Sequence, residues 1–141
     1  MAQTSKIMPT QAASILTGIF KTGNKIALFT SDPNTGVYTK PSAASYSDYT
    51  ILSGDFTTSD NAIYTARHLL FGLAEEAWAS ESNPVKAFGV YSGSTLIYWG
   101  MLTTAVPVAA DTVPVFKVYN ASTGEGIKVT LDVASTSSVS S

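Results

Sequence analysis

The stretch from Lys86 to Thr103, KAFGVYSGSTLIYWGMLT, constrains the fold of this chain more than any other. Residues 87–91 alternate with a period of two, which indicates a β-strand. Ser92-Gly93-Ser94 then forms a short turn in which the glycine is free to adopt a positive φ. Residues 96–102 follow as a run that is apolar on both faces. We therefore predict a β-hairpin at the centre of a sheet, with its second strand in the interior rather than at an edge.

A helix is the alternative for this second half of the hairpin. The run is short for a helix, and Ile97, Tyr98, Trp99 and Gly100 all have weak helix propensity. We therefore retain the strand.

One amphipathic helix is predicted near the N-terminus, over residues 10–21. Thr10 is a suitable N-cap, and Gly23 is a suitable stop. Gly18 lowers the helix propensity by about 1 kcal/mol relative to alanine, and close packing on the sheet would explain its presence. The apolar residues that share one face are Ala12, Ile15, Leu16, Ile19 and Phe20.

The remaining pattern favours further strands separated by turns rich in Gly, Pro, Asn, Asp and Ser. Residues 62–71 also fit a helix that would continue towards Trp78, but a strand followed by a loop is the preferred interpretation. The expected strands are 25–30, 50–58 with a bulge at Gly54, 62–71, a second hairpin within 106–119, and 126–133. Together these patterns predict a mainly β protein: an antiparallel β-sandwich or Greek-key-like domain with one N-terminal amphipathic helix.

The length of 141 residues fits one domain, and a domain of this size buries enough surface to fold without disulfides or a structural metal. The chain contains no cysteine, which excludes disulfides and cysteine-bound metals. We expect an extended N-terminal arm over residues 1–9, a single β-rich domain over 10–133, and a flexible serine-rich tail over 134–141. The tail consists mostly of hydroxyl residues and cannot form a core of its own.

The charge content is low, with 13% charged residues and a net charge of −2. Globular chains average about 25% charged residues, so a surface of this kind favours a protein that packs against neighbours, with a weakly charged monomer as the alternative. No basic stripe predicts a nucleic-acid partner, and no apolar run reaches the roughly 18 residues of a membrane span. The first residues lack the apolar core of a secretory signal, so we expect folding in the cytoplasm where the chain is made.

The sequence offers little catalytic equipment. His68 is the single histidine, and neither a nucleophile elbow nor a phosphate-binding glycine motif is present. Glu75 and Glu76 are adjacent in sequence and would diverge on either a helix or a strand. We therefore predict no catalytic residue, no cofactor and no metal, and leave open a calcium site between subunits built from the acidic residues Asp32, Asp55 and Asp60, which lack calcium-loop spacing.

Contacts with partners are expected at the arm and in the tyrosine-rich loop of residues 37–49. Tyrosine is favoured at interfaces, although the alternative is that these side chains fold back over the core. Trp78 and Trp99 are a candidate platform for sugar binding, with core packing as the alternative. The predicted interface residues are Gln3, Lys6, Met8, Tyr38, Tyr46 and Tyr49.

The order of several short motifs resembles a family of small tailed-phage virion proteins described as tail-fibre-like or minor structural proteins. The matching segments are ALFTSDP at 27–33, FGVY at 88–91, LIYWGMLT at 96–103, ADT at 110–112 and VTLD at 129–132. Residues 38–46 depart from the family pattern because they lack its glycine-rich element. The resemblance implies a virion component without enzymatic activity.

The small size, the absence of a fibre repeat or coiled coil, the low charge and two ends expected to be flexible favour a capsid decoration (cement) protein, made in the host bacterial cytoplasm and located in the virion. We expect it to form a symmetric oligomer, with a trimer as the first choice, on the major capsid protein. One alternative is a protein associated with the tail or tail fibre, in contact with tail proteins. A second is a carbohydrate-binding module that attaches to host glycan, and a third is an enzyme that uses His68.

Overall fold

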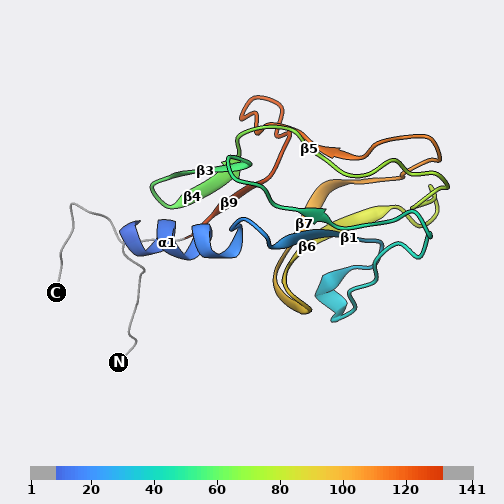
Figure 1. Ribbon diagram of the computed structural model, residues 1–141, viewed down its shortest axis with the longest axis horizontal. Coiled ribbons are helices and arrows are strands. Elements are labelled where there is room, and N and C mark those ends of the chain that lie inside the picture. Colours follow the sequence, from blue (N-terminus) through green and yellow to red (C-terminus); the bar gives the residue numbers. More distant parts are fainter. Residues whose placement is uncertain (1–8, 132–141) are drawn as a thin grey trace.

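The computed structural model describes residues 9–131, which form three antiparallel sheets and one helix near the N-terminus (Figure 1). This confirms the predicted mainly β class with one N-terminal helix. The predicted tail and the arm residues Gln3, Lys6 and Met8 lie outside the described residues. The elements are α1 (Pro9–Ile19), β1 (Lys25–Phe29), the 3-10 helix η1 (Pro33–Thr35), β2 (Tyr49–Thr50), β3 (Phe56–Ser59), β4 (Ala62–Thr65), β5 (Leu69–Leu70), β6 (Val85–Ser92), β7 (Thr95–Val106), β8 (Val115–Phe116) and β9 (Lys128–Thr130).

The largest sheet has the strand order β2-β1-β6-β7. The predicted hairpin is present as β6 and β7, and its turn contains Gly93 with a φ of +61°. β6 lies between β1 and β7, and its residues 87–90 are buried. The interior strand of this sheet is therefore β6.

The prediction that residues 96–102 form an interior strand is wrong, because β7 is the edge strand of its sheet. Its side chains do contact both faces: Tyr98 packs on the main core, and Trp99 packs on a small cluster that contains Ala87. A two-sided apolar pattern reports how the faces of a strand are covered, and it carries no information on the number of lateral neighbours.

A second layer is formed by two chain segments that run antiparallel to each other. β5 pairs with β8, and isolated bridges join Ala74 to Thr112 and Ala79 to Val108. The predicted second hairpin within residues 106–119 is therefore wrong. Its two halves follow residues 69–79 instead, where the carbonyl of Pro114 accepts a hydrogen bond from the Phe71 N–H.

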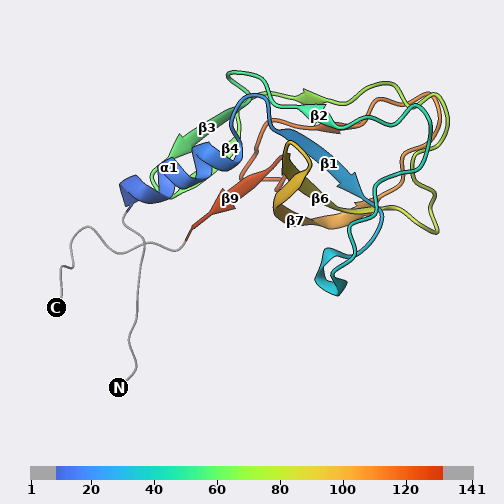
Figure 2. The same cartoon turned by 60° about the horizontal axis from the view of Figure 1, so that its bottom comes forward.

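The third sheet has the order β3-β4-β9 and packs against α1 at one end of the molecule (Figures 1 and 2). The single strand predicted over 50–58 is wrong, since a turn at residues 52–55 separates β2 from β3 and places Gly54 at a φ of +88°. The strand expected over 62–71 likewise divides into β4 and β5. The predicted close packing of Gly18 on the sheet is also wrong, because a Cβ at that position would meet no atom within 4 Å.

Aromatic rings connect the layers and the helix. Phe116 on β8 lies 5.5 Å from Phe88 on β6 and 6.0 Å from Phe71, measured between ring centroids. Phe20, which follows α1, lies 4.7 Å from Phe56 on β3 and 5.7 Å from Tyr98 on β7. The core therefore continues from the two-layered end of the molecule to the helix.

Candidate interaction surface

The two sides of the largest sheet differ in whether their outward backbone groups have partners, and those of β1 do. β2 pairs with Lys25 and Ile26 at one end of β1. Further along, the Leu28 N–H donates to the hydroxyl of Tyr46 at 2.9 Å, and the Thr30 N–H donates to the Thr39 carbonyl at 2.9 Å. A strand, a side chain and a loop thus satisfy the outward donors of this edge in turn.

The opposite edge, β7, is open within residues 9–131, where β6 is the one strand that pairs with it. It is also the longest strand of the structure, with 12 residues, TLIYWGMLTTAV. The strand contains neither a charged residue nor a proline, which are two of the devices that protect natural sheet edges. Met101 near its middle is 45% exposed. We call residues 95–106 the open edge.

Two glycines make room for large side chains where the open edge packs on β6. A Cβ on Gly100 would lie 2.9 Å from the ring of Phe88, and one on Gly89 of β6 would lie 2.8 Å from Leu96 Cδ1 of the open edge. The pairing with β6 is regular from Tyr98 to Met101 and shifts in register between Met101 and Val106. Such shifts bend a strand, and the residues that follow Met101 line a groove.

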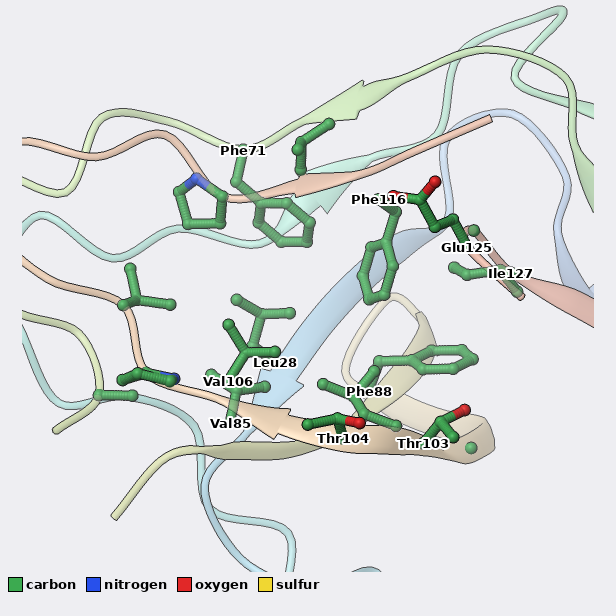
Figure 3. A pocket seen from close by; sticks show the side chains of 18 of the residues that line it. Leu28, Phe71, Val85, Phe88, Thr103, Thr104, Val106, Phe116, Glu125 and Ile127 are labelled. Carbon is green, nitrogen blue, oxygen red and sulfur yellow. The ribbon is translucent and has the colours of Figure 1, made fainter. Parts of the chain in front are cut away.

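This groove has a volume of about 1130 Å³ and runs beside the open edge (Figure 3). Its walls are the second half of β7, the segment 107–116 and the segment 123–129. Phe71, Phe88 and Phe116 point into it, together with Leu28 and Ile127 (Figure 3). Exposed apolar side chains also gather along it, namely Val106, Val113 and Val115. Contiguous exposed apolar surface of this kind marks interaction sites on soluble proteins.

The rim of the groove carries a paired carboxylate. Glu125 accepts a hydrogen bond from Lys117 Nζ at 2.9 Å and from the Thr123 hydroxyl at 3.0 Å. The hydrogen bond from Lys117, with that from Thr123, holds the pKa of Glu125 below its ordinary value. Glu125 is therefore ionised at neutral pH and already paired with Lys117.

The predicted interface tyrosines lie in different environments. Tyr38 is 43% exposed. The hydroxyl of Tyr46 donates to Asp48 at 2.7 Å, and that of Tyr49 donates to Asp55 at 2.6 Å. The last two side chains therefore hydrogen-bond within the chain and pack against the core, and a role for the three tyrosines in partner contacts stays a prediction.

A buried polar cluster around Asp55 is a feature that the sequence did not predict. Asp55 is 1% exposed and accepts hydrogen bonds from the Leu52 N–H at 2.8 Å, from Tyr49 at 2.6 Å and from Arg67 Nε at 2.6 Å. Arg67 also donates to the Ser53 carbonyl. The cluster fixes the turn between β2 and β3, and it lies apart from the groove. Nothing in the sequence separates this aspartate from the exposed ones.

The other residues considered as functional candidates are dispersed. His68 is exposed and its Nδ1 accepts a hydrogen bond from the Val118 N–H at 3.1 Å, and Glu75 and Glu76 are exposed. Trp78 is 4% exposed, and its Nε1 donates to Ser45 Oγ at 2.9 Å, so it is not accessible as a sugar platform. Within residues 9–131, no group of three or more His, Cys, Asp or Glu side chains is arranged to hold a metal ion.

No helix among the described residues is long and apolar enough to cross a membrane. In comparisons with known proteins, no protein-family model matches this chain, and no curated protein matches it.

Proposed function

We propose that this protein is a structural component of a tailed bacteriophage virion that acts through contacts between subunits rather than through catalysis. Within this class, the role we favour is a capsid decoration protein that binds the shell surface as a symmetric oligomer. In this role many copies each add a modest contact, and the sum strengthens the particle. The motif order in residues 27–132 supports the virion assignment.

The observation that carries the proposal is the open edge beside the apolar groove. A 12-residue strand whose outer edge pairs with no strand of residues 9–131, and on which Met101 and Val106 are exposed, is a liability for a free monomer. Such a strand is suited to a protein whose working state covers it. The low charge content of 13% fits the same reading, because interface cores are depleted of charged residues.

Two alternatives remain as proposals of lower rank. A tail or tail-fibre-associated protein would use the same surface against tail proteins. A carbohydrate-binding module would rely on Trp99 and Tyr38, because Trp78 is buried. Both aromatic side chains lie near Phe29 on the sheet face away from the groove.

The experiment that tests the proposal is a count of copies per purified particle by quantitative mass spectrometry. Hundreds of copies that co-sediment with the capsid are expected for a decoration protein, and a handful would assign it to the tail. Absence from particles, combined with specific binding on a glycan array, would replace the virion proposal with the carbohydrate-binding one.

A further inference from the structure

The two edges of the largest sheet differ, and the difference indicates that the open edge binds a partner. At the β1 edge, the N–H groups of Leu28 and Thr30 each have an acceptor supplied by another part of the chain. At the open edge, no other part of residues 9–131 supplies a paired strand. Because the backbone N–H groups at the β1 edge have acceptors within the chain, we expect the backbone groups of the open edge to be paired with a partner in the working state.

The groove makes the open edge a suitable acceptor for an added strand. An extended segment laid beside β7 would find backbone partners along the edge. Its side chains on the groove face would lie against the exposed apolar side chains of Val106, Val113 and Val115. Strand addition combines these two elements, because main-chain hydrogen bonds supply affinity and pockets for alternate side chains supply specificity.

We propose that the open edge pairs with the open edge of a second copy, in antiparallel orientation across a two-fold axis. The strand has no charge over its 12 residues, so two copies meet without placing like charges opposite each other. A two-fold contact uses the same patch on both partners. The other sheet edges offer less, since β2 has two residues, β3 has four, and β9 has three and includes Lys128.

This inference rests on the proposed assembly function, and it differs from the trimer that is the first choice expected for a decoration protein. A two-fold contact produces dimers, or assemblies built from dimers. The stretch from Tyr98 to Met101 pairs with β6 without a register shift, so we place the centre of the new contact within or next to it.

The absence of cysteine from the chain allows a direct test by cross-linking the full-length protein. Single cysteines are introduced at four exposed positions of the open edge, as Ile97→Cys, Met101→Cys, Thr103→Cys and Ala105→Cys, with Thr57→Cys on the β3 edge as the control. A disulfide needs Cα atoms about 4.4–6.8 Å apart. In two-fold antiparallel pairing, a residue meets its own counterpart only next to the axis. We expect oxidation to yield covalent dimers at one of these positions or at two neighbouring ones.

The same contact is tested without cysteines by analytical ultracentrifugation. The unmodified protein is expected at twice the chain mass of 14.8 kDa. Met101→Lys brings two ammonium groups together across the axis and is expected to raise the dimer dissociation constant at least tenfold. Ile15→Lys, on the exposed face of α1, adds the same charge elsewhere and is expected to leave the constant unchanged.

The inference is overturned if the protein sediments as a monomer or a trimer, or if Thr57→Cys cross-links as efficiently as the open-edge variants. Those results would leave the virion assignment intact if the protein is still counted on particles. Conversely, a cross-linked dimer that is absent from particles would support the edge contact and overturn the virion assignment.

Discussion

The hydroxyl of Tyr46 accepts a hydrogen bond from the backbone N–H of Leu28 at 2.9 Å, on the edge of β1 that β2 leaves uncovered. A side chain 18 residues further along the chain thus takes the place of a neighbouring strand. Asp48 holds the phenol in position by accepting a hydrogen bond from its hydroxyl at 2.7 Å, and Lys40 Nζ in turn donates to Asp48 at 2.8 Å. This arrangement closes the β1 edge of the sheet. The open edge of β7 has no such cap among residues 9–131, which is why we infer a partner there.

Replacing Tyr46 with phenylalanine is expected to destabilise the protein by about 1–3 kcal/mol, because it leaves the Leu28 N–H without an acceptor in a partly buried site. Urea denaturation at pH 7 measures the loss. Tyr38→Phe is the matched control, since that side chain is exposed, and it is expected to stay within about 0.5 kcal/mol of the unmodified protein. Equal stability of the two variants would refute the role of Tyr46 as an edge cap.

Asp55→Asn is expected to cost about 3 kcal/mol of folding free energy. The buried carboxylate accepts from Tyr49, Leu52 and Arg67, and the amide nitrogen of asparagine would face one of these donors. Asp60→Asn, in the exposed turn between β3 and β4, makes the same chemical change and is expected to have almost no effect. The urea denaturation midpoints of the two variants are compared. If the Asp55→Asn variant is as stable as the Asp60→Asn variant, the structural role of the cluster is contradicted.

Two glycine-to-alanine substitutions are expected to have opposite signs. At Gly126, with a φ of +86°, a Cβ would lie 2.6 Å from the Lys117 carbonyl oxygen and 2.7 Å from Thr65 Oγ1, so alanine is expected to destabilise by more than about 2 kcal/mol. At Gly18 in α1, a Cβ meets nothing within 4 Å, and alanine is expected to stabilise by up to about 1 kcal/mol. Thermal unfolding of both variants tests the pair, and a destabilised Gly18→Ala protein would show that this helix position is constrained after all.

Alkaline pH is expected to destabilise the fold through its tyrosines. Burial, with the hydrogen bond to Asp55, raises the pKa of Tyr49 to about 12, above its value of about 10 in an unfolded chain. Between these two pKa values the unfolded chain loses the proton while the folded protein keeps it. The contribution of Tyr49 is therefore complete below pH 10 and is lost as the pH rises from 10 to 12.

Urea midpoints at pH 8, 10, 11 and 12 measure this effect, and Tyr49→Phe is expected to flatten part of the decline. The remainder comes from Tyr46 and Tyr98, whose pKa values burial also raises. An identical decline in Tyr49→Phe and the unmodified protein would show that Tyr49 does not contribute.

Local signals in the sequence predict the hairpin, whereas the order of the strands in the sheet depends on long-range pairing that these signals do not report. The turn at Gly93 and the alternation before it involve neighbouring residues, so β6 and β7 were predictable. The strand order was not, because it depends on β1 pairing with β6 across more than 50 residues. A side-chain pattern describes the two faces of a strand, whereas an edge is a property of the backbone pairing. The pattern of residues 96–102 therefore predicts an interior strand where the structure has an edge.

The same limit applies to the candidate surface. The lack of charge and proline in residues 95–106 was visible in the sequence, but its meaning depends on the strand being at an edge. The groove depends on β5 and β8 pairing between segments about 45 residues apart, and the turn signals at Pro107 and Pro114 favoured a local hairpin instead. The burial of Asp55 likewise depends on Arg67, 12 residues later, reaching back to it.

The central claim, that the protein works with its open edge covered by another subunit, is tested most directly by amide hydrogen exchange of residues 95–106. Exchange is measured by mass spectrometry in the dilute isolated protein and in purified particles that contain it. We predict that amides of the open edge exchange at least tenfold more slowly in the particle, while those of β1, whose edge is already closed, change little. Equal exchange of residues 95–106 in the two states would contradict the account.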